Sequence, residues 1–267
     1  TEALRALGHR AGLIDLYFGL ETGGADEAFF DAPVSEAYKK ISREAPDLDQ
    51  VRRGRKGDSP SMFGPGVLEL CRMADMVFLA LHGTCGEDGR VQAAFDLMGI
   101  PYTGAGYLGS AIAMDKDLTK RMVADVVSTP GWKTVTYTAA DIDRLVETAR
   151  LPLVVKPVAS GSSIGVSIAH TAEELRRSLT EGLALGGRTV LEEYIRGREI
   201  QVGILEDKAL PSIEIIPKQG FYDYANKYQP GAALEVCPAE ITPEEEARVR
   251  AAALRVYETL GLSVYSR

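Results

Sequence analysis

Short apolar runs and amphipathic stretches alternate along most of the 267-residue chain. Runs too short for helices and rich in β-branched residues predict strands, whereas apolar residues every three or four positions predict helices. The predicted strands are 11–16, 76–81, 152–155, 166–169, 190–193, 199–205 and 263–267. The predicted helices are 1–9, 65–73, 91–98, 111–127, 141–149, 172–185 and one that begins after Thr242. This alternation indicates an α/β to α+β fold.

Local signals mark two helix starts and one hinge. Thr171 is followed three residues later by Glu174, which is the spacing of a capping box. Thr242 precedes Pro243 and three glutamates, so a cap, a proline and acids share the first helical turn. The segment 99–109 is dense in glycine and other turn formers. We expect it to be a hinge between a first α/β domain and the rest of the chain.

The composition narrows the class of protein. A content of 45% hydrophobic and 25% charged residues is that of a globular protein. A formal charge of −8 disfavours nucleic acid or an anionic membrane as a partner, because such partners need clustered lysine and arginine. The three cysteines lack metal-site spacing and cannot all pair, which favours a reducing compartment. Since no apolar run reaches the ~18 residues of a membrane span and no signal peptide is visible, we expect a soluble cytoplasmic protein.

The strongest chemical signal follows the predicted strand 152–155. Lys156 ends that apolar run, and Gly161, two serines and Gly165 lie in the turn that comes next. The backbone N–H groups of such a turn, the serine hydroxyls and one ammonium group would suit a bound phosphate. An ordinary glycine-rich turn is the alternative interpretation of this stretch taken alone.

A second glycine-rich turn, 82–89, follows the predicted strand 76–81 and precedes a predicted helix. Ligands of open α/β sheets bind at the carboxyl ends of strands, so a small anionic substrate could dock there. A polar turn that only caps the helix is an equally good interpretation. His82 with Cys85 as a base and nucleophile is a weaker one, because close neighbours on one tight loop rarely face each other.

Further lysines and acids could complete a nucleotide site. Lys116 and Lys120 lie one helical turn apart, a spacing that usually means a solvated basic face. Together with Lys156, however, a second lysine would help to neutralise a triphosphate. Glu192 and Glu199 lie near strand ends, where acids can accept hydrogen bonds from an adenine amino group and from ribose hydroxyls.

The segment 219–228 contains four aromatic residues, one lysine and one glycine without regular periodicity. This make-up is typical of a lid that folds over a substrate and excludes water. A packed surface loop is the alternative.

In this order, the segments resemble the ATP-grasp family, and within it the D-alanine:D-alanine ligases. The resemblance is carried by 82–89, 101–104, 110–116, 155–157, 161–165, 192–199, 222–224 with 227–228, and 237–239. It implies three domains, 1–104, 105–191 and 192–267, with ATP between the central and C-terminal ones. It also implies ligation of two D-alanines through an acyl phosphate for peptidoglycan precursor synthesis, with ATP and Mg²⁺, in a homodimer. An NAD-dependent enzyme is disfavoured, because no G-x-G-x-x-G follows a strand.

The resemblance assigns roles to particular residues. His82 would lie beside the first D-alanine, and Arg267 would stabilise the acyl phosphate and the tetrahedral intermediate. Ser162 and Tyr228 would form a latch that closes the lid, and a tyrosine at 228 favours the dipeptide over a D-lactate product. The implied contacts of ATP are Lys116, Lys156, Ser163, Glu192, Tyr194, Ile195, Glu199 and Lys227.

The same resemblance leads us to expect that the printed sequence is a fragment. The family's glutamate for the first substrate would precede Thr1, and its aspartate, glutamate and asparagine ligands for Mg²⁺ would follow Arg267. No metal ligand is therefore predicted within the sequence, and the chain as printed is expected to be inactive. The alternatives are a non-catalytic nucleotide-binding ATP-grasp module and a D-alanine:D-lactate ligase.

Overall fold

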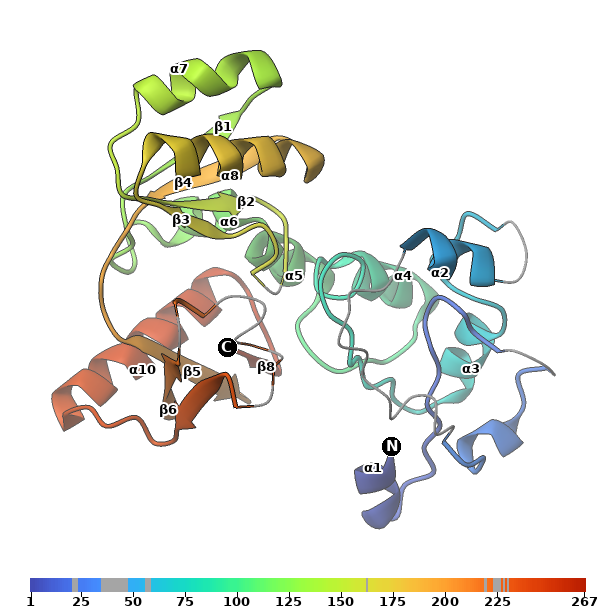
Figure 1. The fold of residues 1–267 in the computed structure, drawn as a ribbon. Coiled ribbons are helices and arrows are strands. Elements are labelled where there is room, and N and C mark those ends of the chain that lie inside the picture. The colour runs from blue at the N-terminus through green and yellow to red at the C-terminus, as the bar shows by residue number, and fades with distance from the viewer. Residues whose placement is uncertain are drawn as a thin grey trace. The chain divides into compact units, whose positions relative to one another are not determined.

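The computed structural model describes residues 1–20, 24–34, 48–55, 59–161, 163–218, 220–222, 227, 229 and 231–267 (Figure 1). The chain forms two compact units. The first comprises Thr1–Phe78 and Asp96–Tyr102, and the second comprises Leu79–Phe95 and Thr103–Arg267. The helix α4 (Arg90–Met98) runs from the second unit into the first.

The first unit contains short helices around a small core that includes Val67 and Leu70. Its elements are α1 (Glu2–Ala6), the 3₁₀ helix η1 (Glu27–Phe30), α2 (Leu48–Gly54) and α3 (Val67–Met73). The predicted strand 76–81 is reduced to one parallel bridge between Val77 and Tyr102.

The predicted strand 11–16 is wrong, because side chains form hydrogen bonds with the backbone in and next to this segment. The Ala11 carbonyl accepts a hydrogen bond from Arg5 Nε (2.9 Å). Asp15 Oδ1 accepts from the Tyr17 and Phe18 amides, both at 2.8 Å, and so forms a turn. Local side-chain bonds of this kind compete with strand pairing.

The second unit contains two antiparallel sheets. The first has the order β1-β4-β2-β3, with β1 (Trp132–Thr136), β2 (Leu153–Pro157), β3 (Ser167–Ala169) and β4 (Arg188–Glu193). Helices α7 (Ile142–Glu147) and α8 (Ala172–Ala184) cover one face of it (Figure 1). A short 3₁₀ helix, η3 (Ala139–Asp141), leads into α7. The core beneath the two helices includes Val155, Leu175 and Leu179, which are almost fully buried.

The second sheet has the order β7-β6-β5-β8 and packs against one long helix. Its strands are β5 (Glu199–Leu205), β6 (Lys208–Pro217), β7 (Ala233–Val236) and β8 (Tyr265–Ser266), and the helix is α10 (Pro243–Thr259). The predicted bounds of 199–205 are confirmed, as are the capping box at Thr171 and the cap at Thr242 with its proline and acids in the first turn. The antiparallel pairing places the fold in the α+β part of the predicted class.

The predicted single helix 111–127 is instead two helices, α5 (Tyr107–Met114) and α6 (Lys116–Val123). Asp115 lies between them with extended backbone angles (φ −83°, ψ 104°). Its side chain accepts a hydrogen bond from the Leu118 amide (2.9 Å) and caps α6. The break therefore places Lys116 at the first position of a new helix.

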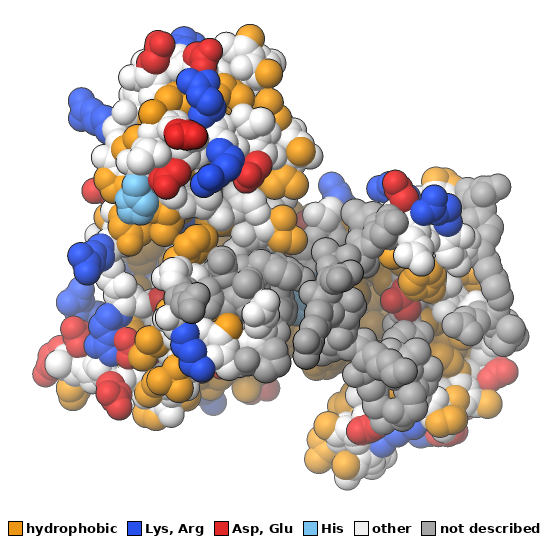
Figure 2. Space-filling model, viewed as in Figure 1, with side chains coloured by type: hydrophobic (Ala, Val, Ile, Leu, Met, Phe, Trp, Pro, Cys, Tyr) orange, Lys and Arg blue, Asp and Glu red, His pale blue; other side chains and the backbone are white. Residues whose placement is uncertain are grey.

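The surface charges, the helix lengths and the cysteines are each a property of the chain alone. On the face shown in Figure 2, acidic and basic side chains of the described residues lie interspersed. Within those same residues, the helices are too short or too polar to cross a membrane. The cysteines Cys71, Cys85 and Cys237 are free.

Candidate functional site

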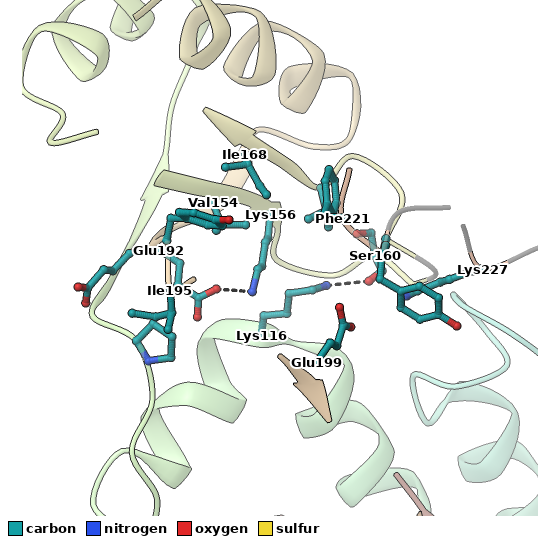
Figure 3. A pocket seen from close by; sticks show the side chains of 16 residues that line it. Lys116, Val154, Lys156, Ser160, Ile168, Glu192, Ile195, Glu199, Phe221 and Lys227 are labelled. Carbon is teal, nitrogen blue, oxygen red and sulfur yellow. Dashed lines mark hydrogen bonds and ion pairs between the residues drawn. The ribbon is translucent and has the colours of Figure 1, made fainter. Parts of the chain in front are cut away.

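A pocket of about 610 Å³ lies in the second unit, on the face of the first sheet opposite α7 and α8 (Figure 3). Strand register creates this face. Val154 of β2 pairs with Ile168 of β3 and with Glu192 of β4, and all three side chains line the pocket. The neighbouring Val155 and Leu191 point the other way, into the core, because side chains alternate along strands.

Every nucleotide contact implied by the family resemblance lines this one pocket. They come from the start of α6, from β2, from the turn after β2, from the end of β4 and the connection to β5, and from the segment before β7. The residues are Lys116, Lys156, Ser163, Glu192, Tyr194, Ile195, Glu199 and Lys227.

One end of the pocket gathers three lysines, Lys116, Lys156 and Lys227. Lys116 Nζ donates a hydrogen bond to the carbonyl of Ser160 (2.7 Å), in the turn after β2 (Figure 3). Burial lowers the pKa of Lys116 to about 8, with Lys156 and Lys227 adding repulsion and Asp115 opposing it. Burial and the charge of Arg267 also lower the pKa of Lys227. Because an anion would relieve these penalties, this end of the pocket is suited to a polyphosphate.

Glu192 lies beneath that end, and lysines engage both of its carboxylate oxygens. Oε2 forms an ion pair with Lys156 and Oε1 forms one with Lys120. Burial alone raises the pKa of Glu192, but the hydrogen bonds from Lys120 and Lys156 more than offset this and lower it. The group is therefore a carboxylate held between two ammonium groups.

Lys120 is not on a solvated basic face, which was the usual meaning of its spacing from Lys116. It is buried, donates to the Pro130 carbonyl (3.3 Å) and lies 4.9 Å from the centre of the Trp132 ring. The sequence contained one signal for this: Lys120 falls on the same helix face as Lys116, which lines the pocket.

Apolar side chains also line the pocket. Val154, Ile168, Ile195 and Phe221 contribute hydrocarbon or aromatic surface to its lining. The ring of Tyr194 is supported edge-on by His170, with centroids 5.7 Å apart and planes at 75°. A slot with apolar walls and a few polar groups suits a planar heterocycle such as a nucleobase. Of these residues, Val154 and Ile168 were missed by the sequence interpretation, although period-two alternation places both on one sheet face.

Glu199 begins β5 and reaches the pocket from the second sheet. Burial raises the pKa of its carboxyl, and the charges of Lys227 and Lys156 oppose that shift. A carboxyl in this position can accept hydrogen bonds from hydroxyl groups of a ligand.

The predicted catalytic residues lie around this site or outside the described residues. His82 is exposed in the turn before α4, next to Gly83. A Cβ atom built on Gly161 would lie 3.2 Å from the Gly83 Cα, so this turn adjoins the glycine-serine turn after β2. Arg267 follows β8, and its charge acts on Lys227. Ser162 and Tyr228 both lie outside the residues that the structure describes.

Comparison with known proteins identifies the family. The model of the D-ala D-ala ligase N-terminus matches residues 24–105, and that of the D-ala D-ala ligase C-terminus matches residues 125–267. The chain belongs to the D-alanine–D-alanine ligase family. The predicted resemblance is therefore confirmed.

Two curated members of the family illustrate the likeness. A D-alanine–D-alanine ligase from Pediococcus pentosaceus is 37% identical over 271 residues, covering 100% of this chain and 77% of the relative. One from Desulfotalea psychrophila is 44% identical over 203 residues, covering 72% and 62%. The alignments therefore span between 62% and 77% of these relatives' lengths.

Solved structures of the D-alanine–D-alanine ligase family and its neighbours share the ATP-grasp fold with this chain. The VanG D-Ala:D-Ser ligase from Enterococcus faecalis matches with a TM-score of 0.63 at 34% identity, covering 72% of this chain and 58% of that one. The Bacillus anthracis D-alanine–D-alanine ligase complexed with ATP matches with a TM-score of 0.61 at 34% identity, covering 74% and 64%.

The family resemblance also implied Mg²⁺. Among the described residues, no group of three or more His, Cys, Asp or Glu side chains is placed to hold a metal ion. Cys85 contacts Arg90, whose Nη1 donates to its Sγ at 3.8 Å. We assign no residue of this part of the chain to a metal.

Proposed function

We propose that this protein is an ATP-dependent ligase that joins two D-alanines to form D-alanyl-D-alanine. Family membership supports the reaction class. The observation that carries the proposal is the lining of the pocket: it combines three lysines with apolar side chains, which suit the phosphates and the base of ATP.

The first chemical step is phosphoryl transfer to a carboxylate. A carboxylate oxygen of the first D-alanine attacks the γ-phosphorus of ATP, the bond from that phosphorus to the β,γ-bridging oxygen breaks, and ADP leaves. Lys116, Lys156 and Lys227 would neutralise the charge that develops on the transferring group. Burial lowers the pKa of Lys116 and of Lys227, so a phosphate beside these two groups stabilises their charged forms.

The second step forms the amide bond. The uncharged amine of the second D-alanine attacks the carbonyl carbon of the acyl phosphate, its nitrogen gives up one proton, and inorganic phosphate leaves from the tetrahedral intermediate. In this proposal Arg267 stabilises the charge of that intermediate and His82 lies beside the first D-alanine. Ser162 and Tyr228 close the lid, which excludes water from the reactive anhydride.

The nucleotide is proposed to bind with Glu192 near the adenine amino group and Glu199 near the ribose. Ser163, Tyr194 and Ile195 would complete the contacts. ATP is proposed to act together with Mg²⁺, which supplies charge neutralisation at the phosphates when bound. The division into domains 1–104, 105–191 and 192–267, a homodimer, a cytoplasmic location and a role in peptidoglycan synthesis remain parts of the same proposal.

Product formation tests the function directly. Protein incubated with ATP, Mg²⁺ and D-alanine should release phosphate and D-alanyl-D-alanine, and L-alanine should support neither. Hydroxylamine should trap the acyl phosphate as a hydroxamate. Lys156→Ala should abolish phosphate release. Nucleotide binding without D-alanine-dependent phosphate release would instead support a non-catalytic ATP-grasp module.

A different second substrate is the alternative that the comparisons favour, since a D-Ala:D-Ser ligase is among the similar solved structures. Offering D-serine, D-lactate and D-alanine in competition separates the options. We expect the dipeptide of D-alanine to dominate at neutral pH. Preferential incorporation of D-serine or D-lactate would reassign the substrate and keep the reaction class.

A further inference from the structure

Three segments of the second unit meet where α6 begins. The backbone N–H of Lys116 donates to the Val158 carbonyl (3.0 Å), just after β2 ends. The N–H of Val158 in turn donates to the carbonyl of Arg188 (3.1 Å), the first residue of β4. Val158 thus links the backbone of Arg188 to that of Lys116. It lies two positions after Lys156.

The side chain of Arg188 makes a second link to the same place. Its Nη1 donates to Asp115 Oδ2 (2.8 Å) and its Nη2 donates to Asp117 Oδ2 (3.1 Å). These two acids flank Lys116 in the sequence. We call Arg188, Asp115 and Asp117 the arginine clamp. One guanidinium group therefore holds the residues on both sides of a pocket lysine.

The clamp is anchored in the sheet rather than in solvent. Asp117 is buried, and its Oδ1 accepts hydrogen bonds from Thr134 Oγ1 (2.6 Å) and Trp132 Nε1 (3.4 Å) of β1. The first turn of α6 is thereby tied to both β1 and β4. A binding side chain loses less conformational freedom on meeting its ligand when the residues around it are already held in place.

Positional control matters for Lys116 in particular. Its helix starts after a break at Asp115, so no continuous helix fixes its direction. It is also half-buried beside two other lysines, whose charges repel it. The Ser160 carbonyl holds the ammonium group, and the arginine clamp holds the residues on both sides of the backbone from which that side chain extends.

We infer that Arg188 is a positioning residue for Lys116: by holding Asp115 and Asp117, it fixes the ammonium group at the phosphate end of the pocket and strengthens nucleotide binding. This inference rests on the proposed function, because it assumes that the pocket binds ATP. It does not depend on which amino acids are ligated.

The chain offers a matched control in Arg121. Its Nε donates to Asp117 Oδ2 at 3.0 Å, the same oxygen that Arg188 contacts. Arg121, however, lies four residues along the same helix, so it ties α6 only to itself. Removal of either arginine takes one cation from Asp117, but only removal of Arg188 takes away the side-chain link between the first turn of α6 and the start of β4.

The test is a calorimetric titration of the full chain with ATP in Mg²⁺-containing buffer at pH 7. Arg188→Met should weaken ATP binding about tenfold, and Arg121→Met should leave it within about twofold. Arg188→Lys, which keeps a charge but cannot reach both acids at once, should fall between wild type and Arg188→Met. Circular dichroism and thermal unfolding establish that each variant is folded; if Arg188→Met is not, Arg188→Lys carries the test.

A double-mutant cycle separates positioning from general loosening. In a Lys116→Met background, the Arg188 substitution should change ATP affinity by less than about twofold, because its effect passes through Lys116. An equal loss in both backgrounds, or an equal loss in Arg121→Met, would overturn the inference. Wild type that binds ATP but does not ligate D-alanine would contradict the proposed function and leave the clamp standing. Wild type that does not bind ATP would overturn both.

Discussion

Glu192 and Lys156 form an ion pair on the floor of the pocket, and the second carboxylate oxygen of Glu192 pairs with Lys120. The carboxylate is almost fully buried, as is Lys120. One buried anion therefore compensates two cations, and part of the net positive charge remains for a ligand. Such an arrangement is costly to disrupt on one side, since the remaining partners stay buried and unpaired.

Glu192→Gln should therefore lower the free energy of unfolding by about 3 kcal/mol. Urea unfolding can be followed by the fluorescence of Trp132, the single tryptophan, whose ring contacts Lys120. Glu193→Gln changes the neighbouring exposed acid and should cost less than about 0.5 kcal/mol. If both variants lose the same free energy of unfolding, the buried ion pairs of Glu192 do not explain the destabilisation.

The pKa of Lys116 predicts how ATP affinity depends on pH. The free ammonium group loses its proton near pH 8, mainly because of burial, whereas phosphate binds the protonated form. Below this pH no proton has to be taken up. Above it, binding requires proton uptake, so affinity should fall by about tenfold between pH 7.5 and pH 9.

Lys116→Arg provides the control for this pH effect, because arginine stays protonated throughout the range. Its ATP affinity should depend much less on pH, even if its absolute affinity is lower. Titration calorimetry in buffers of different ionisation enthalpy would count the protons taken up. A wild-type profile as flat as that of Lys116→Arg would contradict the assignment.

Asp117 should contribute to stability in a pH-dependent way. Burial raises the pKa of its carboxyl, but hydrogen bonds from Thr134, Arg121 and Trp132 together lower it below the usual 3.8. Its stabilisation is therefore complete above the unfolded-state pKa and is lost as the pH falls through the lower native value. Asp117→Asn should cost about 3 kcal/mol at pH 7.

The difference in unfolding free energy between wild type and Asp117→Asn should shrink below about pH 4, where Asp117 begins to take up a proton in the unfolded state before it does so in the native state. Chemical denaturation at several pH values measures it. Asp125→Asn, an exposed change two residues after α6, should have little effect at any of them. If the difference in unfolding free energy between wild type and Asp117→Asn is constant with pH, the charge of Asp117 does not stabilise the fold.

Gly109 in α5 is required by close packing. A Cβ atom there would lie 2.7 Å from the Gly261 carbonyl oxygen, beyond the end of α10. Gly109→Ala should destabilise by about 2 kcal/mol in spite of alanine's better helix propensity. Thermal unfolding checks this. The reverse change at the exposed Ala111, Ala111→Gly, should cost about 1 kcal/mol and calibrates the intrinsic preference.

Much of the second unit was predictable because its signals are local. The capping boxes at Thr171 and Thr242 fixed helix starts, and the β-branched run 199–205 fixed a strand. The residues that the family's ordered motifs implied for ATP line one pocket. The strands β1, β6 and β7 were missed, since their polar or irregular sequences gain strand character only from the partners beside them.

The sequence by itself determined the family, the fold class and the identity of the residues that could meet ATP, because these depend on residue types and spacing. Only the tertiary structure decided how those residues are held. The break at Asp115, the burial of Lys120 against Glu192 and the clamp of Arg188 all join residues from separate segments. The energies of ion pairs and hydrogen bonds depend on distance and burial, and both are set by packing rather than by sequence separation.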